Sequence, residues 1–371
     1  MKSKSSLGLL LFTSMGMLAL IFDAGTAVSG ATAGIELCLR SVIPSLFPFV
    51  VISILLTGLL PFFNMPWLRP LGRWLHLPKN SEKLLLIGLL GGYPVGAQCI
   101  RHAFDSGALS KQDAQRMLCF CNNAGPAFIF GIGAHLFGSS WICWLAWIIH
   151  MLSALLVGAF TPAWEQADNA SIRLQSVSLT DAVQRAIRVM GIICSWVVLF
   201  RIILAFVDRW VFWLLPIQVR ILLSGFLELT NGCAQLAQIE SMGVRFVLFV
   251  TMLGLGGLCV GLQTQAVLGG SGLSLRPYFL GKTAQSALSA ILSMVAMYFF
   301  PGGADRIRWM WFVVPTILCV LCYISFNADK IGIAFPWKMM YTDPKPTGGS
   351  TYETVPQKSR SCLRILHLRR L

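Results

Sequence analysis

A hydrophobic segment that breaks in its middle occurs twice in the chain, as LLIGLLGGYPVGAQ at 85–98 and LLSGFLELTNGCAQ at 222–235. Six of the fourteen aligned positions are identical, and both copies start as an apolar helix before Gly, Pro, Asn and small polar residues interrupt it. Inside a bilayer, the backbone groups freed by such a break need protein partners or a water-filled cavity. Paired breaks in corresponding halves of a chain indicate the substrate site of a transporter. Solute transport is therefore the first hypothesis.

The composition is that of a membrane protein. Hydrophobic residues make up 56% of the 371 residues and charged residues only 12%, whereas soluble domains carry roughly a quarter charged residues. The histidines and cysteines have no metal-ligand spacing, and no phosphate-binding loop occurs. We therefore expect no enzymatic activity, no cofactor and no metal site. The net charge of +14 suits contact with anionic lipids at a cytoplasmic membrane face. We do not expect nucleic acid as a partner.

Eight apolar runs are long enough, or nearly so, to span a membrane, which takes about 20 residues. The two broken segments are interpreted as re-entrant hairpins. The predicted fold class is an all-α integral membrane protein with about eight transmembrane helices plus two re-entrant broken segments, arranged as an inverted-repeat transporter. The apolar runs are 7–24, 46–63, 118–138, 141–161, 189–207, 246–268, 283–300 and 309–326.

The N-terminal segment 1–33 has two interpretations. Lys2 and Lys4 precede an apolar stretch that is followed by AGTAVSGATA, and this order imitates a signal peptide with its cleavage site. An uncleaved transmembrane helix is preferred, because the Lys and Arg residues of the following loops then predict one consistent orientation in the membrane. The domains that follow are predicted as a first repeat at 34–161, a cytoplasmic linker at 162–180, a second, inverted repeat at 181–300, a last transmembrane helix at 301–328 and a basic disordered cytoplasmic tail at 329–371.

The positions of Lys and Arg predict the orientation, since cytoplasmic loops carry an excess of both. With a cytoplasmic N-terminus, the basic loop after the second span lies inside, and the last helix delivers the C-terminus to the cytoplasm. The span 46–63 then runs from outside to inside, and its counterpart 189–207 runs the other way. The two halves are therefore predicted to be inverted, which places a site at the bilayer midplane and supplies two related conformations for alternating access.

Candidate substrate-binding residues come from four polar or Gly-rich stretches inside apolar surroundings. The adjacent carboxamides of Asn122 and Asn123 offer both donors and acceptors, and Gly125 with Pro126 breaks the helix just beyond them. The alternative is that these asparagines only hold helices together and that the glycines serve close packing. The candidate substrate-binding residues are Tyr93, Pro94, Gly96, Asn122, Asn123, Gly125, Thr230, Asn231 and Gln263.

Ionisable residues inside a membrane are rare and suggest function. Glu228 lies in the second broken segment where the first has Gly91, so it is a candidate site for a coupling proton or cation. Arg40 and Arg188 occupy matching places before the two counterpart spans and are candidates for attracting an anion. The alternative for Arg40 is an ion pair with Glu36 at the membrane surface, four residues earlier.

GGYPVGA at 91–97, FCNNAGPAFI at 120–129 and GGLCVGLQ at 256–263 resemble motifs of the sporulation integral membrane protein YlbJ family. That family belongs to the wider nucleoside-recognition, or Gate, domain group, and the resemblance covers roughly residues 30–325. It implies two Gate-like repeats, the plasma or forespore membrane of a sporulating bacterium, and transport of the small anion dipicolinate. Cys259 and Gly261 depart from the small polar residue, often histidine, expected there, which leaves the coupling mechanism open.

The function predicted from these observations is transport of a small planar anion such as dipicolinate through a multi-pass cell-membrane protein, by alternating access. A structural or assembly protein of the spore envelope is the rival interpretation, and a nucleoside or cation permease is a further one. The predicted partners are a small-molecule solute and the bilayer, with anionic lipids near the basic tail. Oligomerisation and sporulation-protein partners stay open.

Overall fold

The computed structural model describes residues 2–59, 65–162 and 177–299, and every regular element in these ranges is helical. This confirms the predicted all-α class. The predicted last transmembrane helix at 301–328, the basic tail at 329–371 and most of the linker at 162–180 lie outside the described residues.

The first half begins with α1 (Lys2–Phe22) and then one long helical stretch. In this stretch α2 (Ala24–Leu37) continues through a π-helical turn (Cys38–Val42) into α3 (Ile43–Leu59), so the helix runs on across residue 33, where the sequence had suggested a boundary. The rest of this half comprises a 3-10 turn (Pro66–Leu68), α4 (Arg69–Trp74), α5 (Glu82–Leu90), α6 (Val95–Asp105), α7 (Lys111–Leu118), α8 (Pro126–Phe137) and α9 (Ser140–Phe160).

The second half repeats this order of elements. A long helix comes first, then a pair of short helices with a break between them, then an interrupted helix, then a closing helix. Its elements are α10 (Leu179–Trp210), a 3-10 turn (Phe212–Leu214), α11 (Ile217–Leu227), α12 (Leu229–Gln235), a second 3-10 turn (Leu236–Gln238), α13 (Met242–Leu255), α14 (Gly257–Leu268) and α15 (Arg276–Tyr298).

The helix breaks occur where the repeated segment predicts them. α5 ends at Leu90 and α11 ends at Leu227, and these two residues are aligned in the repeat. Gly256 and Gly257, which separate α13 from α14, have φ angles of +75° and +81°, a conformation that residues with a side chain rarely adopt. The Gly-rich stretch at 256–263 therefore interrupts the helix because its first two glycines adopt left-handed backbone angles.

The apolar run 118–138 is not one helix, although its length suggested a single span. α7 ends at Leu118 and α8 begins only at Pro126. Proline suits the first position of a helix because it lacks the N–H that would find no partner there. Ser110 and Ser178 cap α7 and α10 by accepting the backbone N–H of Asp113 and Asp181 at 3.0 and 3.1 Å, as their capping patterns predict.

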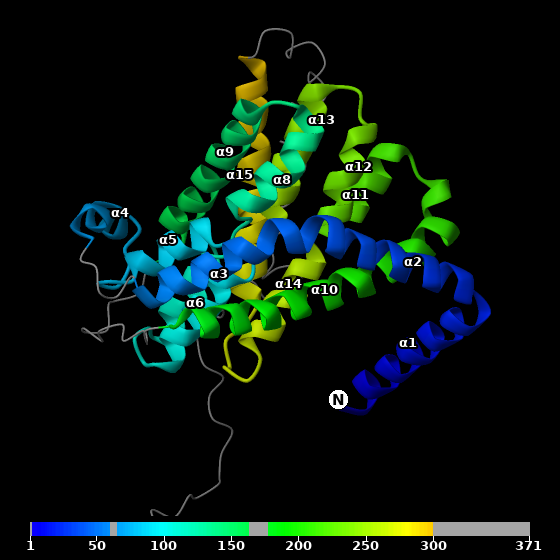
Figure 1. The fold of residues 1–371 in the computed structure, drawn as a ribbon, viewed down its shortest axis with the longest axis horizontal. Helices are drawn as coiled ribbons and strands as arrows, with labels where there is room; N and C mark the ends of the chain where they lie inside the picture. Colours follow the sequence, from blue (N-terminus) through cyan, green and yellow to red (C-terminus); the bar gives the residue numbers. More distant parts are fainter. Residues whose placement is uncertain (1, 60–64, 163–176, 300–371) are drawn as a thin grey trace, which may run out of the picture.

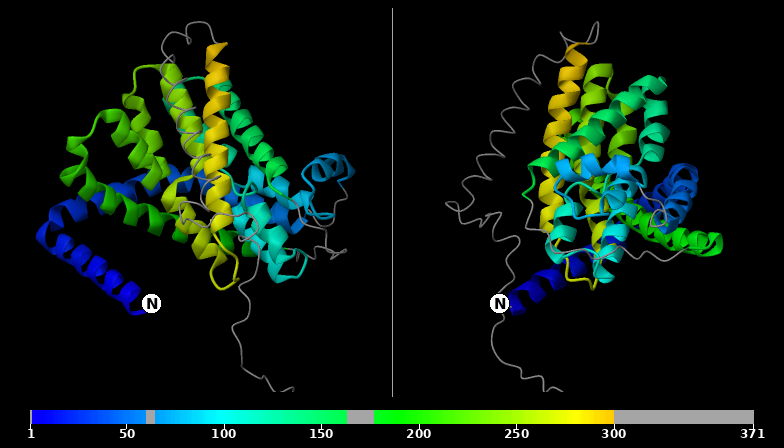
Figure 2. Two further views of the ribbon diagram at one scale, coloured as in Figure 1. Left: turned by 180° about the vertical axis from the view of Figure 1, so that it is seen from behind. Right: turned by 90° about the vertical axis from the view of Figure 1, so that its left-hand side faces the viewer.

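Two groups of helices cross each other. α9, α13 and α15 pack together upright in Figure 1, while α10 runs crosswise to them along α2 and α3. Figure 2 shows the same crossing from behind and from the side. α2 and α10 are antiparallel and very close, since a Cβ on Gly30 would lie 2.9 Å from Ala205 Cβ and one on Gly34 would lie 2.9 Å from Val198 Cα. Small residues allow such close approach of helices.

Helix contacts in one half have counterparts in the other. α3 packs on α8 as α10 packs on α14, and α6 contacts α14 as α12 contacts α8. α7 packs on α15 as α13 packs on α9. These contacts are expected for two similar halves in which the first part of each interrupted helix, α7 or α13, packs against the closing helix of the other half. The inversion of the halves across a membrane stays a prediction.

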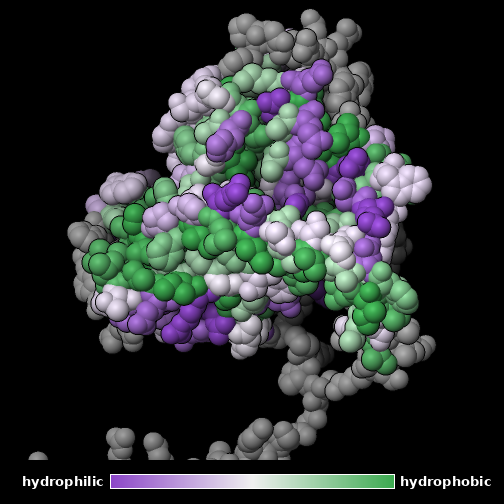
Figure 3. Space-filling view, turned by 45° about the vertical axis from the view of Figure 1, so that its right-hand side comes forward, coloured by the Kyte–Doolittle hydropathy of each residue, from purple (hydrophilic) through white to green (hydrophobic). Residues whose placement is uncertain are grey.

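Four helices in the described ranges are long and apolar enough to cross a membrane: Ala24–Leu56, Ser140–Phe160, Leu179–Trp210 and Met242–Leu268. Fewer spans are found than the eight apolar runs suggested. One run is interrupted, α15 carries polar residues, the first run yields only a shorter apolar helix at Thr13–Phe22, and the run 309–326 is not described. Many large apolar side chains of α2, α3 and α10 are exposed, and Figure 3 shows extensive apolar surface (green) beside hydrophilic areas (purple). Such exposure is what contact with lipid requires.

Candidate solute-binding site

A small cavity lies where α3 and α10 cross the broken helices of both halves. Its volume is about 40 Å³, enough for about one water molecule. Polar groups from both halves meet in it, because each break exposes its residues toward the other half. It is lined by Gly92, Tyr93, Gly125, Glu228, Thr230 and Gln263, together with the apolar residues Val42, Leu46, Phe128, Ile193, Val197, Leu229 and Val260. We call it the central cavity.

The predicted site residues divide into two sets in the structure. Tyr93, Gly125, Thr230 and Gln263 line the central cavity, whereas Pro94, Gly96, Asn122, Asn123 and Asn231 do not. Gly96 serves packing, since a Cβ there would overlap the carbonyl oxygen of Cys121. The substrate-binding role of both sets stays a prediction.

Asn122 supports the backbone of the first break. It is fully buried, its Oδ1 accepts the N–H of Ala97 at 3.3 Å, and its Nδ2 donates to Thr264 Oγ1 at 3.0 Å. The N–H groups in the first turn of a helix have no partner inside that helix. Asn122 therefore caps α6 from another segment and ties it to α14, as the helix-holding interpretation of the asparagines proposes.

Asn123 belongs to a buried polar cluster behind the central cavity. Its Oδ1 accepts hydrogen bonds from Lys282 Nζ at 2.8 Å and from Gln285 Nε2 at 3.0 Å. Lys282 Nζ also donates to Gln285 Oε1 at 2.7 Å and lies 5.4 Å from the centre of the Tyr93 ring. His150 completes the cluster, with Nε2 accepting the backbone N–H of Ala124 at 3.2 Å. All these polar residues except Tyr93 are fully buried.

Lys282 is the unexpected member of this cluster. It is 0% exposed, and none of the ion pairs between described residues joins it to a carboxylate. A buried ammonium group is costly unless it is paired or well hydrogen-bonded, and two amide oxygens and the faces of two tyrosine rings surround it here. The site therefore holds a basic group that an anion can complement.

Sequence reasoning did not single out Lys282 as a candidate site residue. The signal was present in α15, where Lys282, Ser286, Ser289 and Ser293 follow one another at intervals of three or four residues and, like the neighbouring Gln285, are buried. Residues three and four apart lie on one helix face. A polar stripe on an apolar helix thus identifies the face turned toward the interior of the bundle.

Glu228 caps the second break. Its carboxylate accepts the backbone N–H groups of Thr230 at 3.0 Å and Asn231 at 2.6 Å, which lie in the first turn of α12. A carboxylate at this position is stabilised by the unpaired N–H groups of the helix. Glu228 is only 2% exposed and also lines the central cavity. It has a structural role, and a coupling role stays a prediction.

Two larger cavities flank the central one along α10. The first, of about 490 Å³, is lined by Arg201, Leu204, Ala205, Asp208 and Arg209 of α10, with α2 and α12 opposite. The second, of about 430 Å³, is lined by Arg185 and Ile192 at the other end of α10, with α3 and α6 opposite. The central cavity touches Ile193 and Val197 between them. The three cavities therefore follow one another along the length of α10.

The flanking cavities are matched by the sequence repeat. Gln235 of α12 lines the first and Gln98 of α6 lines the second, and these glutamines are aligned and identical in the two broken segments. We call the first the Arg201 cavity and the second the Gln98 cavity. Neither Arg40 nor Arg188 lines any of the three: Arg40 forms an exposed ion pair with Glu36 at 3.1 Å, and Arg188 is exposed. Their role in attracting an anion stays a prediction.

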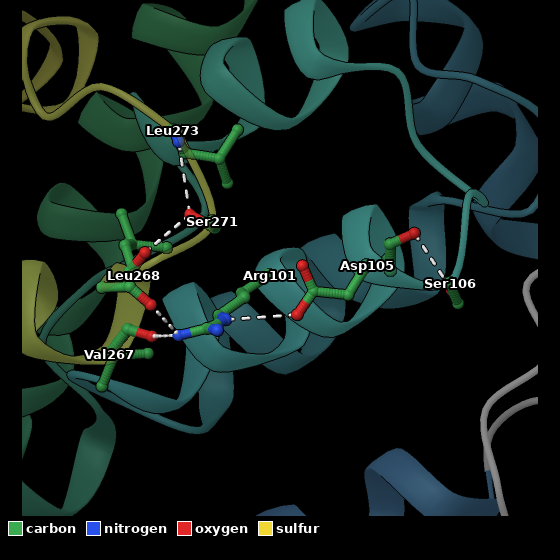
Figure 4. A network of polar contacts seen from close by, with 9 residues as sticks. Arg101, Asp105, Ser106, Val267, Leu268, Ser271 and Leu273 are labelled. Atoms are coloured by element: carbon green, nitrogen blue, oxygen red, sulfur yellow. Dashed lines mark hydrogen bonds and ion pairs between the residues drawn. The ribbon is translucent and has the colours of Figure 1, made fainter. Parts of the chain in front are cut away.

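An arginine closes one edge of the Gln98 cavity. Arg101 Nη1 of α6 donates to the carbonyl oxygens of Val267 at 2.6 Å and Gly269 at 2.7 Å at the end of α14, and its Nε binds Asp105 at 3.2 Å (Figure 4). Arg245 makes the comparable connection in the other half, from Ile239 after α12 to Leu136 at the end of α8. Guanidinium groups suit the carbonyl groups left free at helix ends.

These features define an all-α integral membrane protein in which two broken helix pairs enclose a polar interior. The chain is similar to the sporulation integral membrane protein YlbJ of Bacillus subtilis (strain 168), with 23% identity over 310 residues, which cover 71% of this chain and 75% of that protein. This likeness confirms the resemblance drawn from the motifs and supports membership of the YlbJ family. No protein-family model matches the chain, and no solved structure gives a significant match.

Proposed function

We propose that the chain is a membrane carrier, not an enzyme, which moves a small planar anion such as dipicolinate during sporulation by alternating access. The observation that carries the proposal is the central cavity, to which both broken segments contribute polar residues. Unwound backbone at the meeting point of two related halves is where carriers bind their solutes. The curated relative supports the setting of the proposal, since it is a sporulation membrane protein.

The electrostatics around the cavity support an anion as the solute. α6, α8 and α14 all begin at the breaks, and the N-terminal end of a helix carries a partial positive charge. Lys282 adds a buried ammonium group behind Tyr93. Glu228 contributes the opposing negative charge, which the N–H groups of α12 already bind. The remaining positive potential favours a carboxylate.

The volume of the central cavity supports alternating access. Ligand sites usually measure about 300–1,000 Å³, whereas the central cavity has about 40 Å³. A ring-sized solute therefore requires α6 or α12 to move away from α10. The flanking cavities lie along α10 on either side of the central one, so each would provide access in one of two conformations of an inverted repeat.

The proposal includes a location and partners. We place the protein in the cell membrane or forespore membrane as a multi-pass protein with both termini cytoplasmic. The basic tail would lie against anionic lipids, which attract Lys and Arg near the membrane surface. No nucleic acid is proposed as a partner, and binding of a second copy or of other sporulation proteins is compatible with this arrangement.

A structural or assembly role in the spore envelope is the second candidate function. It is favoured by glycines of α5, α6 and α15 that pack against the backbone after α7, because a Cβ on Gly88 or Gly96 would overlap Cys121 O and one on Gly281 would overlap Cys119 O. These glycines thus serve close packing of backbone on backbone. In this interpretation the polar groups at the breaks only satisfy one another, and no solute crosses.

Uptake of labelled dipicolinate into proteoliposomes that hold the purified full-length chain tests the proposal. We expect saturable uptake, with a labelled nucleoside and ferrous iron taken up no faster than by protein-free vesicles. Imposed proton and sodium gradients identify the coupling ion, and loss of the gradient effect in Glu228→Gln would assign coupling to that carboxylate. Absence of uptake by folded protein supports the assembly role, and uptake of the nucleoside or iron alone supports the permease alternatives.

A further inference from the structure

The Arg201 cavity is bounded by α2, α10, α11 and α12 and has a volume of about 490 Å³, which lies in the usual range for a small-molecule site. Two carboxylates and two guanidinium groups line it. Asp23 binds Arg209 at 3.0 Å, and Asp208 binds Arg220, which lies outside the lining, at 2.9 Å. Both carboxylates of the lining are therefore already paired.

Arg201 is the basic residue of the lining that takes part in neither of these ion pairs. Its Nη1 donates to Asn231 Oδ1, and none of the ion pairs between described residues includes it. Its Nε atom is buried and has no hydrogen-bond partner among the described residues. A guanidinium group donates through a rigid fork that matches a carboxylate with two parallel hydrogen bonds. The Nε donor of this fork is thus unused among the described residues.

Ser224 gives a second, independent indication of a ligand. It is 0% exposed, it lines the same cavity, and its Oγ has no hydrogen-bond partner among the described residues. A buried hydroxyl without a partner costs about 1–3 kcal/mol. Arg201 and Ser224, each with a buried donor that has no partner among the described residues, therefore line one cavity together with Asn231 and Gln235.

We propose that the Arg201 cavity binds a carboxylate of the solute through Arg201 and Ser224 before the solute reaches the central cavity. The position of α12 explains the order of these two events. Asn231 and Gln235 face the Arg201 cavity, whereas Thr230 and Glu228 line the central one, so α12 separates them. A carboxylate that takes both donors of the fork displaces Asn231 Oδ1 from Arg201 Nη1 and thereby loosens α12 from α10.

Glu228 is the carboxylate that Arg201 faces through this connection. The Asn231 backbone N–H donates to Glu228 Oε2 at 2.6 Å while its side chain accepts from Arg201. Asn231 therefore links Glu228 to Arg201, and Glu228 itself accepts hydrogen bonds from two N–H groups of α12. An incoming carboxylate does not have to displace Glu228 in order to reach Arg201.

Equilibrium binding of labelled dipicolinate to the purified full-length chain tests this inference, which rests on the proposed function for its choice of probe. Pyridine-2,6-dicarboxamide, which has the same shape without the charge, is the comparison ligand. We expect Arg201→Gln to weaken dipicolinate binding at least tenfold, Ser224→Ala to weaken it severalfold, and Arg201→Lys to retain part of it. The diamide should bind weakly and equally to all variants.

Arg276→Gln is the control, because it removes one positive charge at an exposed residue that lines none of the three cavities. It should bind dipicolinate like the wild type. Unchanged affinity in both Arg201→Gln and Ser224→Ala would overturn the inference, whichever solute is transported. Saturable uptake that is independent of Arg201 overturns the inference alone. Arg201-dependent binding without any uptake supports the inference and contradicts transport.

Discussion

Lys282 donates a hydrogen bond to Asn123 Oδ1 at 2.8 Å, across 159 positions of sequence. The contact joins α15 to the break between α7 and α8, and it places a buried basic group directly behind the ring of Tyr93. Asn123 itself donates to Phe120 O at 2.6 Å, so it holds the unwound backbone and the ammonium group together. The break between α7 and α8 and the ammonium group of Lys282 are therefore held in place by the same side chain, that of Asn123.

Replacement of Lys282 by methionine should separate function from stability. The loss of the hydrogen bond to Gln285 Oε1 is offset because a buried ammonium group no longer has to be desolvated, and Asn123 Oδ1 retains the hydrogen bond from Gln285. We expect the melting temperature of Lys282→Met in detergent to be unchanged or raised, while dipicolinate uptake falls at least tenfold. Full uptake by this variant would show that the ammonium group plays no part in handling the anion.

Asn122→Ala should act in the opposite way, mainly on stability. The change leaves the N–H of Ala97 without its partner, and Ala97 is fully buried. An unsatisfied buried donor costs about 1–3 kcal/mol. Thermal unfolding of the purified variant should show a clearly lower melting temperature, and hydrogen exchange should increase at the start of α6. A variant as stable as the wild type would contradict the capping role of Asn122.

Gly96 and Gly191 predict contrasting effects of the same substitution. A Cβ on Gly96 would overlap Cys121 O, whereas one on Gly191, inside α10, has nothing within 4 Å. Gly96→Ala should therefore reduce the yield of folded protein strongly. Gly191→Ala should raise stability by about 0.5–1 kcal/mol, because alanine favours a helix over glycine by that amount. Size-exclusion profiles and melting curves of the two variants, measured side by side, provide the check, and equal behaviour of the pair would refute this packing.

Arg101→Gln should loosen the connection between α6 and α14. The guanidinium group binds two carbonyl oxygens at the end of α14, and the glutamine side chain is shorter and carries no charge, so it cannot replace these bonds. Hydrogen–deuterium exchange should rise in the segment after Leu268 and at the end of α6, with α9 unaffected. Exchange rates identical to those of the wild type would mean that Arg101 does not hold the two helices together.

The repeated segment made much of the fold predictable. Leu90 and Leu227, aligned in sequence, both end a helix, because the polar and Gly-rich residues that follow cannot continue an apolar helix without losing burial. The capping serines and the ion pair between Glu36 and Arg40 were also recognisable. Each of these features depends on residues within four positions of one another, and such short-range patterns are visible in a sequence.

The candidate site was only partly predictable, because its contacts join distant segments. The sequence indicates that Asn122 and Asn123 lie in a break, but not that one caps α6 and the other binds Lys282 of α15. Likewise the position of Arg201 in the apolar run 189–207 suggests a side chain that extends to the lipid interface. In the structure its guanidinium group instead contacts Asn231 of α12. Which groups meet across more than a hundred residues is decided by packing, and a single sequence does not contain that information.

Uptake of labelled dipicolinate by the wild type and by Gln263→Leu, in matched proteoliposomes, tests the central claim most directly. Gln263 lines the central cavity, and among the described residues its amide donates to the sulfur of Cys259 alone, at 3.3 Å, so its loss should leave the fold intact. The account predicts saturable uptake by the wild type and at least a tenfold lower rate for the variant. Equal uptake by the two proteins, or none by folded wild-type protein, would contradict it.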